Sequence, residues 1–347
     1  MVVSSNVNRR IVLASRPNGA PVKENWKLEE VPKPQPKQGE VLLRTIYISL
    51  DPYLRGRMTE GPSYVECINI GEVFGGKIAE SVYVVEQSNN PNFKVGELVE
   101  GSFGWQDYAI SDGKDLIKLD GPELNDPVKA IGALGMPGFT AYYGFNEIGQ
   151  PKKGETVVVA AATGAVGSLV GQFAKAKGCY VVGIAGGDEK CKYAVEKLGF
   201  DKCLDHKKGD LKQLLKDACP KGIDIYYENV GGKVFEAVFP LLNVMSRVPL
   251  CGLISLYNAT SLQNGEINLP GFQITLLKKR IRYEGFIIFD HWSGYDKFKK
   301  ETRDLVKKGS FVFKEDIVKG LENAPSALMG LLEGKNFGKL VIQVGDI

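Results

Sequence analysis

Strands and helices alternate in the middle third of the chain, and this pattern constrains the fold more than any other feature. Residues 155–162 (ETVVVAAA) form a short apolar run typical of a buried strand, and residues 168–178 (SLVGQFAKAKG) show helical periodicity that ends at Gly178. A second apolar strand follows at 180–187 (YVVGIAGG), and helix and strand patterns continue to alternate through 223–232 (IDIYYENVGG). This spacing predicts an α/β fold with a doubly wound parallel sheet.

The flanking regions have a different character. The chain of 347 residues is long enough for two domains. The first third is predicted to be rich in β-structure, with strands at Val41–Leu43, Thr45–Ile48 and Ile78–Val85 separated by turn-rich segments. Beyond residue 232 we predict a helix at 234–243 and strands at 247–255 and 282–289. In the C-terminal tail we predict a helix at 327–335 and a closing strand at 339–347.

A glycine-containing turn joins the first apolar strand to its helix. Glycines in such a turn let the backbone approach a pyrophosphate, whose charge is favoured by the amide groups at the helix N-terminus. We therefore expect Gly164, Ala165, Val166 and Gly167 to bind the pyrophosphate of a dinucleotide, and Gly171 to let the helix pack closely. The pattern is A-x-x-G-x-x-G, not G-x-G-x-x-G, and glycine turns are common at such junctions. The surrounding strand, turn, helix and second strand favour the nucleotide site.

The end of the second strand indicates which dinucleotide binds. An NAD site places Asp or Glu there to bind the ribose 2′-hydroxyl. This strand ends in Ala185–Gly186–Gly187 without an acid, and Lys190 follows closely. We expect NADPH, with Lys190 binding its 2′-phosphate; the alternative is that Lys190 is an ordinary solvated helix lysine.

Composition excludes several other functions. The net charge is +3 with the lysines dispersed, which argues against a nucleic-acid surface. The six cysteines form no C-x-x-C pair, and the two histidines are His206 and His291, so we expect no metal site. No segment resembles a signal peptide or a membrane span, and a cytoplasmic location is expected. Cys67 is interpreted as an ordinary thiol, and Asp51, before Pro52, as either a turn cap or a catalytic group.

Several long motifs then point to a family. They include ISLDPYLRGRM, FGWQDYAIS, LGMPGFTAYYG, VVVAAATGAVGS, GIDIYYENVGGKVFEAV, CGLISLYNA, RIRYEGFII and GKNFGKLVI, and they extend almost from end to end. In these motifs the chain resembles the zinc-independent medium-chain dehydrogenases/reductases, which include prostaglandin, leukotriene and 2-alkenal reductases. The bacterial curcumin-reductase branch looks most similar.

The resemblance implies a domain organisation and a set of cofactor contacts. A Rossmann NADPH-binding domain at 129–310 is inserted in a GroES-like β-barrel substrate domain at 1–128 and 311–347, and the protein is expected to form a homodimer. Many family members carry a tyrosine where this chain has His206, so the contact of His206 with the 2′-phosphate is less firmly implied. The residues expected on the nicotinamide side are Asn229, Cys251, Ser255, Tyr257, Phe286, Ile287, Ile288 and Asn336.

The implied reaction is NADPH-dependent reduction of the carbon–carbon double bond of α,β-unsaturated ketones and aldehydes. Hydride reaches the β-carbon, and hydroxyl donors stabilise the enolate. The expected catalytic residues are Tyr64 and Tyr257, and the expected substrate-binding residues are Tyr53, Tyr64 and Met136. Tyr53 is equally explained by packing under its loop, and Tyr64 by simple exposure in a Gly-Pro turn.

Two alternatives share the cofactor site. An NADPH quinone oxidoreductase of the same superfamily would pass hydride to a quinone. A non-catalytic NADPH-binding protein would bind the cofactor without turnover. The DPYLRGRM and SLYN segments favour enone reduction over both.

Overall fold

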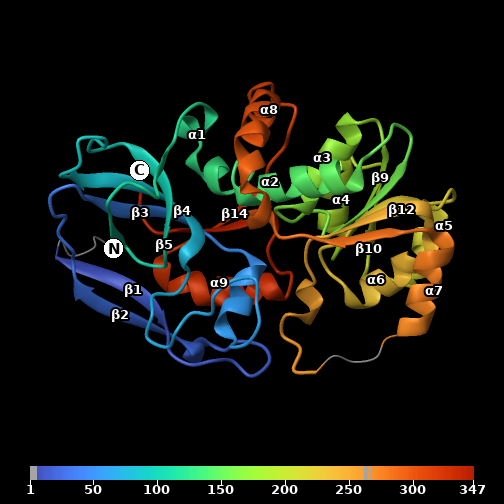
Figure 1. The fold of residues 1–347 in the computed structure, drawn as a ribbon, viewed down its shortest axis with the longest axis horizontal. Coiled ribbons are helices and arrows are strands. Elements are labelled where there is room, and N and C mark those ends of the chain that lie inside the picture. Colours follow the sequence, from blue (N-terminus) through green and yellow to red (C-terminus); the bar gives the residue numbers. More distant parts are fainter. Residues whose placement is uncertain (1–5, 262–264, 266) are drawn as a thin grey trace. The chain divides into compact units, whose positions relative to one another are not determined.

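The computed structural model describes residues 6–261, 265 and 267–347, and these divide into two compact units. One unit comprises Met1–Gly135 with Glu315–Ile347, and the other is Met136–Lys314. The second unit is therefore inserted in the sequence of the first. Figure 1 shows the helices and strands of both units.

The inserted unit is built on a parallel sheet. Its strand order is β10-β9-β8-β11-β12-β13, and every neighbouring pair is parallel. This confirms the doubly wound parallel sheet predicted from the alternating pattern, because the order reverses beside β8. The strands are β8 (Thr156–Ala160), β9 (Tyr180–Ala185), β10 (Lys202–Asp205), β11 (Ile223–Tyr227), β12 (Leu242–Leu250) and β13 (Arg282–Gly285).

Helices cover both faces of this sheet. In Figure 1, α3 and α4 lie on one side, and α6 and α7 on the other. The central strands β8 and β11 are almost entirely buried, as their continuous apolar runs require. The helices of this unit are α2 (Met136–Tyr143), α3 (Gly167–Ala176), α4 (Asp188–Glu196), α5 (Leu211–Ala218), α6 (Gly232–Val238), α7 (Leu269–Lys279) and α8 (Tyr295–Lys307).

Three predicted boundaries in this unit are wrong. The helix predicted at 234–243 ends at Val238, and β12 already begins at Leu242. The strand predicted at 247–255 ends at Leu250, which still forms a parallel bridge with Glu228; beyond it the N–H groups of Ile254 and Ser255 bond to carbonyls of the loop after β11. The strand predicted at 282–289 ends at Gly285. Apolar residues continue past both strand ends into loops, so hydrophobicity alone misplaces the boundaries.

The other unit contains a mostly antiparallel sheet. Its strand order is β14-β15-β3-β4-β5-β7, with β6 paired to β3, and β1 pairs with β2 in a separate two-stranded sheet. The two strands predicted at 41–43 and 45–48 are one strand, β3. The elements are β1 (Val7–Leu13), β2 (Trp26–Pro32), β3 (Val41–Ser49), β4 (Gly76–Ser88), β5 (Leu98–Phe103), β6 (Tyr108–Ser111), β7 (Ile117–Lys118), β14 (Glu315–Lys319), β15 (Lys339–Gln343), α1 (Pro122–Asn125) and α9 (Ala324–Leu332).

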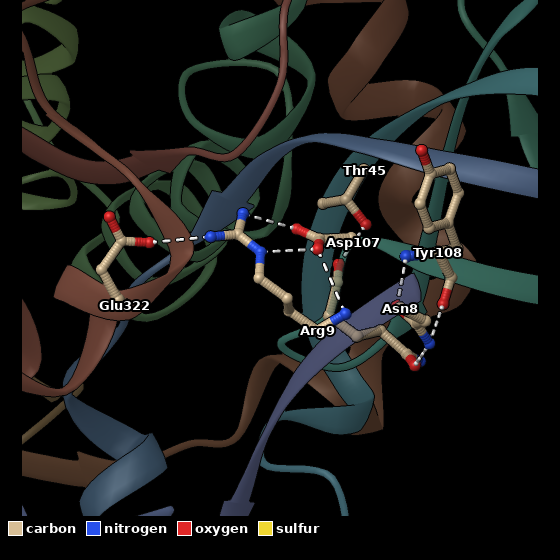
Figure 2. Close-up of polar contacts among 7 residues, drawn as sticks. Asn8, Arg9, Thr45, Asp107, Tyr108 and Glu322 are labelled. Carbon is tan, nitrogen blue, oxygen red and sulfur yellow. Dashed lines mark hydrogen bonds and ion pairs between the residues drawn. The ribbon is translucent and has the colours of Figure 1, made fainter. Parts of the chain in front are cut away.

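Polar contacts attach the first strand to this unit (Figure 2). Arg9 binds Asp107 through Nε at 2.8 Å and through a second nitrogen at 3.0 Å, and it also contacts Glu322 at 3.3 Å. The side chain of Asn8 donates to the carbonyl of Tyr108 and accepts from its N–H group. Because bidentate arginine–carboxylate pairs are strong and directional, β1 is held in a defined position.

A buried ion pair ties the last strand to the loop after β3. Lys339 Nζ lies 2.7 Å from Asp51 Oδ1 and 3.0 Å from the carbonyl of Leu50, and Ser49 also bonds to Asp51. Both charged side chains are less than a tenth exposed. Removing one partner of such a pair leaves the other charge buried and unpaired, which destabilises the fold. Of the two interpretations of Asp51, this contact supports a structural one.

Within the described part of the chain, no helix combines the length and the apolar character needed to cross a bilayer.

Candidate functional site

The turn between β8 and α3 requires glycine at one position. Gly164 donates its N–H to the carbonyl of Ala161 at 2.9 Å, and Ala161 itself has a positive φ of 50°. A Cβ atom on Gly167 would lie 2.3 Å from that same carbonyl oxygen. The chain can therefore turn this tightly only if residue 167 lacks a side chain. The geometry agrees with a backbone cradle at Gly164, Ala165, Val166 and Gly167, as expected for a pyrophosphate.

Close packing of α3 also depends on glycine. A Cβ atom on Gly171 would lie 2.0 Å from the ring of Phe200, which is 3% exposed and follows α4. The sequence predicted a close approach to the sheet, whereas the closest contact is this ring. The small residue therefore lets α3 and the segment after α4 lie together over the strands.

Basic side chains gather at the end of β9, where an NAD site would hold an acid. A Cβ atom on Gly186 would lie 3.0 Å from His206 Nε2, 3.0 Å from Lys207 Cε and 3.5 Å from Lys207 Nζ. The charges of Lys207 and Lys190 both act on His206. The structure thus brings the predicted Lys190 and His206 together. It adds Lys207, which the sequence analysis overlooked although it directly follows His206.

The electrostatics of this cluster keep His206 neutral. Burial first, and then the charges of Lys207 and Lys190, lower the pKa of His206, while Asp205 opposes them. Burial also acts on Asp205, but the N–H groups of Gly187 and Lys207 outweigh it and lower the pKa of that carboxyl. Near neutral pH the positive charge of the cluster is therefore carried by the lysines.

A second part of the site lies where β11 and β12 end. Glu228 is fully buried, and its Oε1 accepts the N–H groups of Val230 at 2.7 Å and Gly231 at 2.9 Å. Its carbonyl accepts the N–H groups of Cys251 and Gly252. Glu228 therefore holds the segments after both strands. Burial raises the pKa of its carboxyl.

Asn229 links this region to the glycine turn. Its Nδ2 donates to the carbonyl of Ala160 at 2.8 Å, at the end of β8. Ser255 Oγ donates to the carbonyl of Val230 at 2.6 Å, which joins the segment after β12 to the segment after β11. Three predicted residues, Asn229 after β11 and Cys251 and Ser255 after β12, are thus brought to one edge of the sheet. Ligands bind at this edge in doubly wound sheets.

Tyr257 lies at the end of the segment that follows β12 and folds back onto it. Its hydroxyl oxygen accepts the N–H group of Leu253 at 3.4 Å, and it lies 3.1 Å from the position of a Cβ on Gly252. The sequence analysis placed Tyr257 after a strand at CGLIS, but that segment is a loop followed by a short 3-10 helix, Ile254–Leu256. Burial raises the pKa of Tyr257, so the phenol keeps its proton at neutral pH.

The remaining predicted residues occupy several places. Phe286 and Ile288 are buried after β13, with Ile287 half-buried between them. Phe286 contacts Gly144, the first residue of the short π-helix Gly144–Gly149 that follows α2, and an added Cβ there would lie 2.6 Å from its ring. Met136 is buried at the start of α2 and accepts a hydrogen bond from Thr140 through its carbonyl.

Three predicted residues belong to the other unit. Tyr53 is half-buried against the apolar core there, and burial raises its pKa well above the ordinary value. Tyr64 also contributes to that shift and is 54% exposed. Asn336 donates through Nδ2 to the carbonyl of Gly338.

Among the described residues, no group of three or more His, Cys, Asp or Glu side chains could hold a metal ion. All six cysteines are free thiols.

Two family models match the chain. Residues 9–119 match the N-terminal domain of oxidoreductases, and residues 165–307 match a family described as zinc-binding dehydrogenases. The two regions cover most of both units.

Curated relatives and a solved structure match almost the whole chain. The NADPH-dependent curcumin reductase of Escherichia coli is 57% identical over 98% of each chain. The 2-alkenal reductase (NADP(+)-dependent) of Nicotiana tabacum is 43% identical over 97% of each chain. The crystal structure of CurA in complex with NADPH from Vibrio vulnificus is 55% identical, with a TM-score of 0.93, and the match covers 98% of this chain and all of that one.

Burial of Glu228 predicts a specific pH dependence of stability. A carboxyl whose pKa is raised by folding contributes stability that is complete below its unfolded pKa of about 4.3 and is lost as the pH rises through its folded pKa. Glu228→Gln keeps an oxygen acceptor for Val230 and Gly231 but cannot ionise. We therefore expect this variant to be more stable than the wild type above neutral pH by about 1–3 kcal/mol.

The measurement is the free energy of unfolding by urea between pH 4 and pH 9. The control is Glu196→Gln, an exposed carboxylate on α4, which should leave the wild-type profile unchanged. Identical pH profiles for Glu228→Gln and the wild type would contradict this account of the buried carboxyl.

Proposed function

Because the chain belongs to the medium-chain dehydrogenase/reductase family, we propose that it is an NADPH-dependent reductase of carbon–carbon double bonds conjugated to a carbonyl. One observation carries this proposal. The chain is 57% identical, over nearly its full length, to a relative named for NADPH-dependent curcumin reduction. Relatives named 2-alkenal reductase and (+)-pulegone reductase, 43% and 39% identical, support the same class of reaction.

The inserted unit fits NADPH by its own chemistry. Gly164–Gly167 allow the pyrophosphate to approach the backbone, and the acid-free strand end at Gly186 is lined by His206 and Lys207. An anionic 2′-phosphate is favoured beside the ammonium group of Lys207, whereas a ribose hydroxyl alone gains little from that charge. Asn229, Cys251, Ser255, Phe286, Ile287, Ile288 and Asn336 are the residues proposed to contact the nicotinamide half of the cofactor.

The proposed reaction places defined demands on the protein. NADPH, when bound, supplies the hydride that reduces the β-carbon of an enone or enal. The carbonyl oxygen then carries developing negative charge, which preorganised hydroxyl donors of the protein stabilise. A proton must next reach the α-carbon from a hydroxyl group or from water.

Tyr257 and Tyr64 are the proposed donors. The raised pKa of Tyr257 keeps its phenol protonated, and the hydrogen bond that it accepts from Leu253 leaves its own O–H able to donate. Tyr64 is exposed and therefore accessible to a substrate. Tyr53 and Met136 are proposed to contact the substrate, although both lie mainly within apolar surroundings.

Removing these hydroxyl groups tests the assignment. Tyr257→Phe and Tyr64→Phe preserve the ring and delete a donor, so turnover should fall by about ten- to a thousandfold if one donor dominates. NADPH affinity should stay within about twofold. The measurement is NADPH oxidation with a panel of enals, enones, a curcumin-like dienone and quinones.

The panel also separates the competing functions. A wild type that is active only with quinones is a quinone oxidoreductase, and one that binds NADPH without any turnover is a binding protein. Either result contradicts the proposal. Wild-type turnover in the double Phe variant would instead reject the two tyrosines as donors.

We further propose that the protein is a homodimer assembled through the β13 edge and α7. Within the described residues, β13 is the last strand of its sheet, and Arg282 pairs along it with Glu284 at 2.6 Å. If two copies of β13 pair antiparallel about Tyr283, Arg282 of each copy faces Glu284 of the other, which makes the edge self-complementary. The ring of Tyr283 packs on Phe272 of α7, so the edge and that helix are continuous.

Exposed apolar side chains on α7 also support an interface with a second copy of the chain. Ile274 is 51% exposed and Leu277 is 78% exposed, and they lie one turn apart on one side of the helix. Val244 and Met245 of β12 add exposed apolar surface at 53% and 59%. Exposed apolar patches on a protein surface are typical of protein–protein interfaces.

A charged residue on α7 should weaken the dimer. Leu277→Glu is expected to raise the dimer dissociation constant at least about tenfold, because burying an unpaired carboxylate costs more than 1.4 kcal/mol. Val95→Glu, at a residue 67% exposed in the other unit, is the matched control and should remain dimeric. Light scattering after gel filtration measures the mass. A monomeric wild type, or an unchanged Leu277→Glu dimer, would reject this interface.

We propose a cytoplasmic location for the protein. All six thiols are free, and Cys67, Cys191, Cys203 and Cys251 are only partly buried. Partly accessible thiols are compatible with a reducing compartment.

A further inference from the structure

The pairing of β10 with β9 places the side chains of His206 and Lys207 over Gly186. Strand β10 pairs Asp205 with Ala185, and the N–H group of His206 donates to the carbonyl of Ala185 at 3.0 Å. The next residue, Lys207, then extends along Gly186, with Cε 3.0 Å and Nζ 3.5 Å from the position of a Cβ atom there. Any side chain at residue 186 would therefore displace the lysine.

Asp205 fixes the position of this lysine. Its Oδ1 accepts the N–H group of Gly187 at 2.9 Å and the N–H group of Lys207 at 3.0 Å. One oxygen atom thus joins the turn after β9 to the turn after β10. The first of these turns leads directly into α4, which carries Lys190. Asp205 therefore sets the distance between the two lysines.

The neighbouring Lys208 is directed elsewhere. Its Nζ lies 2.5 Å from both carboxylate oxygens of Asp188. Two consecutive lysines thus have different roles: Lys208 neutralises an acid at the start of α4, and Lys207 turns to the end of β9. The difference gives Lys207 a matched control in the adjacent residue.

We propose that Lys207 is a specificity-determining residue that binds the 2′-phosphate together with Lys190, and that Asp205 is the positioning residue that holds Lys207 there. This inference rests on the proposed NADPH specificity and deepens it. With His206 neutral, two ammonium groups provide the charge that a phosphate requires at this strand end.

The first test measures binding, not turnover. Dissociation constants for NADPH, NADH, 2′,5′-ADP and 5′-AMP are determined by calorimetry for the wild type, Lys207→Ala and Lys208→Ala. Lys207→Ala should weaken NADPH and 2′,5′-ADP by about ten- to a hundredfold, the effect of one charged hydrogen bond, and change NADH and 5′-AMP by less than about twofold. Lys208→Ala should bind all four ligands as the wild type does.

The second test separates positioning from general stability. Asp205→Asn retains an oxygen that accepts from Gly187 and Lys207, so it should bind NADPH as tightly as the wild type or more tightly, because a negative charge near the phosphate is removed. Asp205→Ala loses the acceptor and should lower the preference for NADPH over NADH by at least about fivefold. A merely structural role would reduce thermal stability without changing this ratio.

The outcomes distinguish the inference from the function on which it rests. A wild type that binds NADPH and NADH equally well overturns the cofactor assignment and this inference with it. A wild type that prefers NADPH, with an unchanged preference in Lys207→Ala, overturns only the role of Lys207. An unchanged preference in Asp205→Ala overturns the positioning role.

Discussion

Glu228 lies fully buried where β11 ends, and its hydrogen bonds organise the edge of the sheet on which the proposed site depends. Its side chain holds the turn at Val230 and Gly231, and its main chain holds Cys251 and Gly252. The segments after two adjacent strands are thereby joined through one residue, and Asn229 extends the connection to Ala160 at the end of β8. A buried carboxyl is costly, but here its bonds prevent three loop segments from moving independently.

At the same edge of the sheet, strand pairing explains the proposed preference for NADPH over NADH. Parallel pairing places the end of β10 beside the end of β9, so cations that follow β10 reach the position from which an acid is absent. The sheet therefore creates charge selectivity without any residue of β9 contributing a charged group. Asp205 adds a negative charge to this cluster, yet its lowered pKa shows that the amide groups of Gly187 and Lys207 compensate for it.

Sequence patterns predicted the architecture well, because buried parallel strands must be continuous apolar runs and their turns must contain glycine at fixed positions. The pattern at 156–171 located β8, α3 and the need for Gly167. Boundaries near 242–255 were not predictable, since the apolar character of β12 continues into the loop that carries Tyr257. There the strand pairing stops after the bridge of Leu250 with Glu228, and hydrophobicity does not encode that change.

Two site residues were missed for similar reasons. Nothing in the sequence distinguishes Lys207 from Lys208; their roles follow from the bonds of Asp205 and from the ion pair of Lys208 with Asp188. Glu228 stands beside the predicted Asn229, but only its burial reveals that it organises the loops. One general signal does apply to both lysines, because the ends of neighbouring parallel strands meet at one edge of the sheet and residues that follow them lie close together.

The central claim is that this chain directs hydride to the β-carbon of a conjugated double bond. The most direct measurement uses NADPH deuterated at the transferred position of the nicotinamide ring, an α,β-unsaturated ketone as acceptor, and NMR analysis of the product. The expected product is a saturated ketone with deuterium at the β-carbon alone. Deuterium at the carbonyl carbon of an alcohol, or oxidation of NADPH without deuterium in the product, would contradict it.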